Sequence, residues 1–423
     1  MKSALIQFSV ENFRSFRDRV TFSMETIHPS TKVDDKYCHY FSVWKKSHNI
    51  YVAKNSFIFG PNASGKSNLL SAIQYMDMKV ESSHDASKKE DMRQDYFRLN
   101  QTNKNIPSFF EMIMEIDTEI FQYNFEILWE EIISENLYWI GVDKETEPKQ
   151  LLKRWWGIFE LGNALGNMLN NDNARDIKDR KTDSTTLFIS AAQNWKEPTA
   201  QKIAWFFRES LRTMDMWKWS TYTKKRIKDD NLFKKKVLQY ISKGDFSICD
   251  IDVIETNPPQ ELIEKYPTLQ WKKGLDMSVA HKVFDDKWNH IDTVSFEEND
   301  ESDGTRNFLK ILWPILDTLD NGRILLVDEF NTSLHPLLCE FIIDISLDTE
   351  INKSNAQFIF ATHDISILDN KKLNKDQFWF TERDKYGASS LYSLDDFDIR
   401  NDDKNYQTKY RNGRFGAVPF IPN

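Results

Sequence analysis

The chain has 423 residues, of which 40% are apolar and 29% are charged, and its formal net charge is −9. This length predicts two or three domains, and the negative charge excludes a global attraction to nucleic acid, so any such contact requires a local patch. The three cysteines are scattered and form no CxxC pair, which indicates reduced thiols. The opening residues are too short and polar for a signal peptide, and no apolar run approaches about 18 residues. We therefore expect a cytoplasmic protein without a membrane partner.

The first segments of the chain predict strands. Residues 4–10 and 20–24 have strand character, and the segment between them carries Arg14 and Ser15. These two side chains lie where a turn could reach a nucleotide. A surface arginine is an equally good interpretation of these residues alone.

A glycine-rich loop follows the apolar run at residues 56–59. Its pattern is Gly60-x-x-x-x-Gly65-Lys66-Ser67, and a helical pattern continues from it. Strand, loop and helix together predict a phosphate-binding site, because glycines let backbone N–H groups point at phosphate oxygens and the helix start adds its positive dipole end. We expect Lys66 to reach the β- and γ-phosphates of ATP and the Ser67 hydroxyl to bind Mg²⁺. The expected nucleotide-binding residues of this loop are Gly60, Pro61, Asn62, Ala63, Ser64, Gly65, Lys66, Ser67 and Asn68.

Beyond this loop the pattern of apolar residues changes twice. Two runs with period two, at residues 110–116 and 121–127, predict a hairpin with one buried face. Helical patterns rich in lysine and tryptophan then follow, such as residues 200–216. We therefore expect an inserted, mainly helical lid domain at residues 129–287. The two parts of an ATPase head would flank it, at residues 1–128 and 288–423.

A basic stretch lies inside this insertion, at residues 217–236. It holds Lys218, Lys224, Lys225, Arg226, Lys228, Lys234, Lys235 and Lys236, interleaved with aromatic side chains. Such a stretch could hold DNA or RNA through phosphate contacts and base stacking. A solvated helix face explains it at least as well.

Two acidic residues that follow an apolar run are further candidate site residues. Residues 324–327 predict a buried strand that delivers Asp328 beside the phosphate loop to hold Mg²⁺. Glu329 is then placed to orient or deprotonate the attacking water. Another apolar strand, at residues 357–361, precedes His363, which can sense the γ-phosphate.

These motifs together resemble the ABC-type ATPase heads of the SMC, RecF and OLD group. The matching motifs are the phosphate loop, an S-x-G turn at Ser302 and Gly304, L-L-V-D-E at residues 325–329, T-S-L-H-P at 332–336 and T-H-D at 362–364. Over nearly its full length, including the tail G-R-F-G-A-V-P-F at residues 413–420, the chain resembles bacterial abortive-infection ATPases of the AbiL and RloA type. It departs from the usual signature in having E-S-D-G-T rather than L-S-G-G-Q.

The resemblance implies an α/β fold with an ABC-type P-loop head, in which a mixed sheet is joined to an antiparallel β subdomain. It also implies ATP hydrolysis with Mg²⁺ at two composite sites of a head-to-tail homodimer, which could form part of a higher oligomer. Ser302 and Gly304 of one subunit would close on the γ-phosphate bound by the other. The implied function is the control of a separately encoded toxin or nuclease effector in anti-phage defence. The alternative is a RecF-like DNA-repair ATPase that dimerises as a clamp.

An effector would need a docking surface, and tryptophans of the insertion are the first candidates for it. They are Trp155, Trp156, Trp195, Trp205 and Trp217, with the tail at residues 414–420 as the second choice. Burial of these aromatics within the lid's own core is the alternative for most of them.

Overall fold

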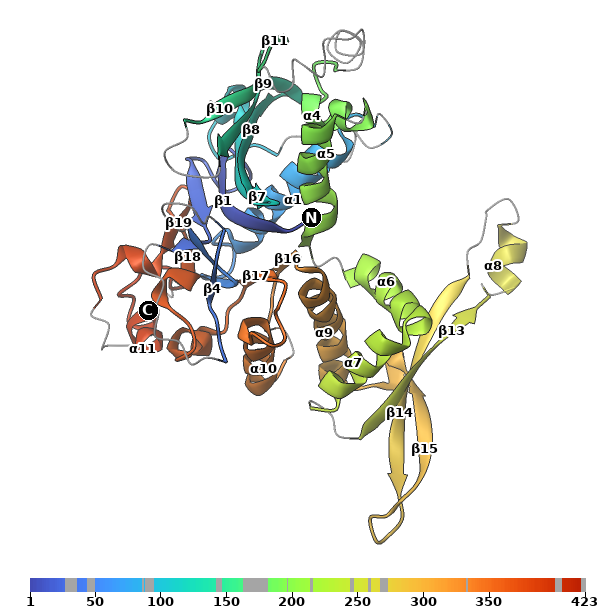
Figure 1. The fold of residues 1–423 in the computed structure, drawn as a ribbon. Helices are drawn as coiled ribbons and strands as arrows, with labels where there is room; N and C mark the ends of the chain where they lie inside the picture. Colours follow the sequence, from blue (N-terminus) through green and yellow to red (C-terminus); the bar gives the residue numbers. More distant parts are fainter. Residues whose placement is uncertain are drawn as a thin grey trace. The chain divides into compact units, whose positions relative to one another are not determined.

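The computed structural model describes fourteen segments of the chain. They are residues 1–26, 36–43, 50–85, 87, 95–141, 147–162, 182–195, 197–213, 216–243, 247–257, 260–266, 273–331, 334–399 and 405–419. The chain divides into two compact units, Met1–Thr213 with Asn321–Phe330 and Ile343–Asn423, and Met214–Asp320 with Asn331–Ile342 (Figure 1). Among the described residues, no helix combines the length and apolarity needed to cross a membrane.

The first unit contains a six-stranded sheet that carries the phosphate loop. Its strand order is β12-β16-β17-β6-β18-β19, and all neighbours are parallel except β18 and β19. The strands span Asn55–Phe59 (β6), Leu211–Thr213 (β12), Ile324–Val327 (β16), Gln357–Ala361 (β17), Phe378–Arg383 (β18) and Ser389–Ser393 (β19). Every residue of β6, β16 and β17 is buried, as expected for central parallel strands. Because these three strands are parallel, their carboxyl ends meet at one edge of the sheet.

The same unit contains a seven-stranded antiparallel sheet with the order β11-β10-β9-β8-β7-β1-β2. Its strands span Ser3–Glu11 (β1), Val20–Ser23 (β2), Ser108–Ile116 (β7), Glu119–Leu128 (β8), Glu131–Gly141 (β9), Lys149–Trp155 (β10) and Ile158–Leu161 (β11). The predicted hairpin is confirmed as β7 and β8. Its two turn residues, Asp117 and Thr118, both have positive φ, which matches the twist that tight hairpins need. The expected combination of a mixed sheet with an antiparallel β subdomain is therefore confirmed.

Smaller elements complete the first unit. A three-stranded sheet joins Glu25–Thr26 (β3), Tyr40–Ser42 (β4) and Tyr51–Ala53 (β5). The helices are Lys66–Ser82 (α1), Phe188–Ala192 (α4), Pro198–Trp205 (α5) and Tyr406–Arg411 (α11), while Pro336–Leu347 (α10) belongs partly to each unit. Helix α1 buries Leu69, Ile73, Met76 and Val80, whose spacing of three or four residues places them on one face.

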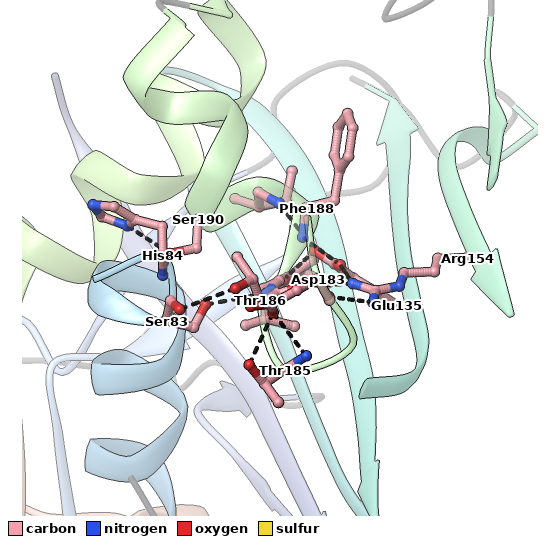
Figure 2. A network of polar contacts seen from close by, with 12 residues as sticks. Ser83, His84, Glu135, Arg154, Asp183, Thr185, Thr186, Phe188 and Ser190 are labelled. Atoms are coloured by element: carbon pink, nitrogen blue, oxygen red, sulfur yellow. Dashed lines mark hydrogen bonds and ion pairs between the residues drawn. The ribbon is translucent and has the colours of Figure 1, made fainter. Parts of the chain in front are cut away.

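A buried polar network ties the antiparallel sheet to the end of α1 (Figure 2). The Glu135 carboxylate on β9 accepts a hydrogen bond of 2.6 Å from the Phe188 N–H at the start of α4. Arg154 on β10 donates to the Thr186 carbonyl at 2.6 Å, and its guanidinium lies 3.6 Å from Glu135. The Thr186 hydroxyl in turn donates to the Ser83 carbonyl just after α1. Burial raises the pKa of Glu135, which Arg154 opposes.

The expected helical lid at residues 129–287 differs from the structure in its first part. Trp129 and Glu130 form a two-residue turn with φ of 50° and 74°, and the chain then returns as β9 alongside β8. Residues 132–135 are all buried, so β9 lacks the clean alternation by which strands are recognised. The first unit consequently continues to Thr213 rather than ending near residue 128.

The helix expected at residues 200–216 is shorter in the structure. Helix α5 ends at Trp205, a π-helical turn covers Phe206–Ser210, and Leu211 then begins β12 beside Ile324. The residues predicted for one helix face, Ile203, Ala204, Phe207 and Leu211, are all buried. Pairing with the buried sheet edge therefore overrides the helical periodicity at Leu211.

The second unit is a mixture of helices and strands rather than a helical bundle. Its helices are Met216–Asp229 (α6), Asn231–Ile241 (α7), Gln260–Lys265 (α8) and Asp303–Asn321 (α9), and its antiparallel sheet contains Ile248–Thr256 (β13), Gly274–Phe284 (β14) and His290–Glu297 (β15). Helices α6 and α7 pack against β13. Helix α9 continues through Pro314 and buries the apolar residues around it, including Leu312, Ile315 and Leu316.

Candidate functional site

Two positions of the phosphate loop require glycine, because of both their backbone conformation and the atoms packed against them. Gly60 has φ of 153°, and a Cβ atom there would come within 2.4 Å of the Thr381 carbonyl oxygen. Gly65 has φ of 124°, and its Cβ would lie 2.7 Å from the Ser389 hydroxyl. Both positions therefore exclude a side chain, and the loop closes tightly against β18 and β19 before α1 begins.

The Lys66 side chain is buried over its own loop. Its ammonium group donates to the carbonyls of Gly60, at 2.7 Å, and Pro61, at 3.0 Å. Burial lowers the pKa of Lys66 to about 8, although the carboxylates of Asp328 and Glu329 act in the opposite direction. An anionic ligand would favour the charged form of this amine and raise its pKa again.

The motifs predicted from sequence line one cavity of about 560 Å³. Of the predicted site residues, Arg14, Ser15, Asn62, Ala63, Ser64, Gly65, Lys66, Ser67, Asn68, Asp328, Glu329 and His363 contribute to its wall. Gly60 does not line the cavity and instead packs against Thr381 at the start of the loop. This gathering follows from the sheet order, because the carboxyl ends of β6, β17 and β16 lie side by side at one edge.

Two side chains with oxygen donors suited to Mg²⁺ line this cavity. The Ser67 hydroxyl lies in the first turn of α1 and the Asp328 carboxylate lies just after β16, and both residues are exposed. A hydroxyl and a carboxylate are hard donors that suit Mg²⁺, which typically binds proteins through one or two such groups together with substrate phosphates. The residues present therefore fit a magnesium–nucleotide complex.

Glu329 and His363 extend the chemistry of the cavity wall. Glu329 has φ of 51°, an uncommon value for a residue other than glycine, and its N–H donates to the Asp328 carboxylate at 3.0 Å. Burial, together with the positive charge of Lys66, lowers the pKa of His363 below its ordinary value. The imidazole is therefore mostly neutral at pH 7, so either ring nitrogen can serve as donor or acceptor.

The structure also supplies site residues that the sequence did not indicate. Asp95 accepts from the Arg14 guanidinium at 3.1 Å and lies 3.1 Å from the Arg98 guanidinium, and its carbonyl accepts from the Arg14 N–H. The cavity lining further includes Tyr96, Leu99, Ala361, Arg383 and Gly387. No spacing rule identifies these residues, because they come from loops and from the ends of β17 and β18, which only the tertiary fold brings to the phosphate loop.

The predicted signature-like motif lies in the second unit, at the start of α9. The Ser302 hydroxyl accepts from the Thr305 N–H at 3.1 Å, and the Ser302 carbonyl accepts from the Arg306 N–H. Ser302 therefore caps α9 and is itself exposed, while Gly304 lies in the first turn. Thr332 and Ser333 of the T-S-L-H-P motif lie outside the described residues.

The basic stretch at residues 217–236 is largely neutralised within its own unit. Five of its cations pair with carboxylates: Lys224 with Glu298, Arg226 with Asp317 and Asp320, Lys228 with Glu255, Lys234 with Asp250, and Lys236 with Asp320. Lys225 and Lys235 are exposed, and the side chain of Lys218 lies outside the described residues. These ion pairs favour the interpretation of a solvated helix surface whose positive charges are neutralised by neighbouring carboxylates.

Comparisons with known proteins place this arrangement in a family. The family model described as "AAA domain, putative AbiEii toxin, Type IV TA system" matches residues 56–369, about three quarters of the chain. The fold is also similar to an SMC head domain from Thermotoga maritima, at 14% identity over 93% of this chain and 99% of that chain, with a TM-score of 0.40. An SMC head from Pyrococcus furiosus, bound to the C-terminal domain of ScpA, is 12% identical over 93% and 96% of the two chains, with a TM-score of 0.43. No curated protein matches the sequence.

Proposed function

Because the chain belongs to this AAA-domain family, we propose that it binds ATP with Mg²⁺ and hydrolyses it. The observation that carries this proposal is the single cavity on which Lys66, Ser67, Asp328, Glu329 and His363 converge. Backbone N–H groups of the phosphate loop and the Lys66 ammonium would hold the phosphates. Magnesium, held by Ser67 and Asp328, would neutralise charge on the phosphates as the terminal phosphoryl group is transferred.

Glu329 is the residue we assign to the attacking water. Its carboxylate sits beside the metal ligand Asp328 at the rim of the cavity, where it can accept a proton. His363 lies on the same wall and can donate a hydrogen bond to the terminal phosphate. Arg14 and Ser15 contribute further polar groups around the bound nucleotide.

Two substitutions separate binding from hydrolysis. Lys66→Ala should lose ATP binding, whereas Glu329→Gln should keep it and turn over at least about 100-fold more slowly, since a positioned base contributes that much. Titration with a fluorescent ATP analogue and release of inorganic phosphate measure the two effects. Glu350→Gln, which changes a side chain that is 82% exposed, is the matched control and should keep the wild-type rate. Undiminished turnover in Glu329→Gln would remove that residue from its role.

We further propose that the nucleotide state controls a separately encoded toxin or nuclease effector in anti-phage defence, as in ATPases of the AbiL and RloA type. The description of the matching family, which refers to a toxin–antitoxin system, supports this proposal. So does the exposed turn between β10 and β11, where Trp155, Trp156 and Ile158 are 54%, 59% and 68% exposed. Exposed aromatic side chains that lie together are typical anchors for a protein partner.

The other predicted docking residues are less available. Trp205 is half-buried, and the side chains of Trp195 and Trp217 lie outside the described residues. In the tail, Phe415 and Ala417 are buried, and Phe420 lies outside the described part. We therefore place the effector surface at the turn between β10 and β11.

Expression with the genomic neighbours tests the regulatory proposal. A neighbour should form a stable complex, and phage protection should require both Lys66 and Glu329. Replacing Trp155 and Trp156 by serine should weaken that complex and leave ATP turnover unchanged. Trp288→Ser, at the most exposed of the tryptophans whose side chains are described, should not weaken it. Full protection by the chain alone, or no binding neighbour, would contradict the proposal. Tight ATP-dependent DNA binding by the purified chain would favour the repair clamp instead.

A further inference from the structure

A second cavity, of about 500 Å³, adjoins the nucleotide cavity. Its wall includes Asn62, Ser64 and His363, which also line the nucleotide cavity, and it is completed by Val418 and Pro419. The last two residues belong to the G-R-F-G-A-V-P-F tail, which the proposed chemistry does not use. A segment about 350 residues from the phosphate loop in sequence therefore forms a wall beside it.

The tail is held in place by ring contacts and by hydrogen bonds to its backbone. Phe415 is 1% exposed and packs against the rings of Phe380 and Phe397, with centroid separations of 6.0 Å and 5.3 Å. The Tyr392 hydroxyl donates to the Phe415 carbonyl at 2.8 Å, and the Tyr410 hydroxyl donates to the Ala417 carbonyl. These contacts fix the backbone immediately before Val418.

Gly416 shows how closely the tail approaches its support. It has φ of 63°, and a Cβ atom there would lie 2.7 Å from both the Glu382 carboxylate and the Tyr392 hydroxyl. Gly413 has a similar φ of 73°, but its Cβ would meet only a Val418 methyl group at an ordinary 3.7 Å. The two glycines therefore share a left-handed backbone conformation, and only at Gly416 would an added Cβ atom overlap side-chain atoms of the support, so that these must shift.

We propose that the last described part of the tail, residues 415–419, is a positioning element of the nucleotide site. Val418 and Pro419 line the same cavity as Asn62 and His363, and the tail sets the geometry for turnover by limiting the space open to these two side chains. This inference rests on the proposed ATPase function. Small displacements of positioning groups lower turnover strongly, while ground-state binding through the loop backbone and Lys66 is retained.

The test compares the two glycines. Gly416→Ala should lower kcat for ATP by at least about fivefold, because the added methyl group pushes the tail away from its support, and should leave the Kd for ADP within about twofold. Gly413→Ala carries the same left-handed strain without the overlap and should keep the wild-type kcat. Val418→Ala, which removes part of the wall alone, should lower kcat in the same sense. Thermal melting checks that each variant is folded.

Several outcomes of these measurements would contradict the proposal. Turnover within twofold of wild type in both Gly416→Ala and Val418→Ala would overturn the proposal, provided that wild-type turnover requires Lys66. Equal losses in the two glycine variants would assign the effect to backbone strain and would also overturn it. An equal loss of ADP affinity would indicate collapse of the loop rather than positioning. A wild-type chain without ATP turnover would overturn the proposed function together with this inference.

Discussion

At the scale of single residues, Lys66 determines how the site should respond to pH. Burial lowers its pKa to about 8, and the triphosphate of ATP would favour the charged amine and raise that pKa again. Binding above pH 8 must therefore take up a proton, so affinity falls as pH rises. The Kd for ATP should be about tenfold weaker at pH 9 than at pH 7, because about nine in ten free molecules then carry neutral lysine.

Lys66→Arg provides the control for this titration. A guanidinium stays charged throughout the range, so the Kd of that variant should be nearly independent of pH between 7 and 9. Isothermal titration at several pH values measures both proteins. The same loss of affinity in the two would show that Lys66 is not the titrating group.

At the scale of elements, Arg226 joins helices α6 and α9 within the second unit. It donates to Asp317, which is 1% exposed, and to Asp320 at 3.3 Å, and it lies 4.0 Å over the ring of Phe233. Removal of the arginine would take the guanidinium charge away from the Asp317 carboxylate, which stays buried. The pair therefore belongs to the architecture of this unit, although its sequence context suggested nucleic-acid binding.

Arg226→Ala should consequently lower the free energy of unfolding by about 3 kcal/mol. Lys225→Ala, at the exposed neighbouring position, should change it by less than about 0.5 kcal/mol. Urea denaturation followed by tryptophan fluorescence measures both variants. If the two variants lose the same stability, the buried ion pair does not hold α6 to α9.

At the scale of the whole molecule, the head-to-tail homodimer that the resemblance implies would share each ATP site between subunits. Ser302 caps α9 and presents an accessible helix start, as a contact with nucleotide bound by another subunit requires. Ser302→Arg should leave ATP binding intact and abolish turnover, because the larger side chain blocks that contact. Lys66→Ala should lose binding in its own subunit.

Mixing these two inactive proteins should restore turnover to one site of each mixed dimer. That site combines an intact phosphate loop with an intact Ser302, so up to about half of the wild-type rate per dimer is expected. Phosphate release is measured across a series of mixing ratios, with each variant alone as the control. No rescue at any ratio would contradict a composite site.

Sequence alone determined the parts of the site that follow from local rules. The spacing of Gly60, Gly65 and Lys66 specifies the loop, and the apolar runs before Asp328 and His363 specify buried strands that end in functional side chains. These strands occur as β16 and β17, and parallel pairing with β6 brings their ends to one edge. The apolar runs therefore predict the strands, and their parallel pairing brings the residues that follow them to the phosphate loop.

Tertiary structure decided what depends on contacts between distant segments. The turn at Trp129 and Glu130 carries no glycine or asparagine, so only the pairing of β9 with β8 reveals the strand that follows it. Asp95 reaches Arg14 across 81 residues, and the tail reaches the phosphate loop across a still longer separation. Such contacts depend on which surfaces the packed core brings together, and no local pattern of side chains encodes them.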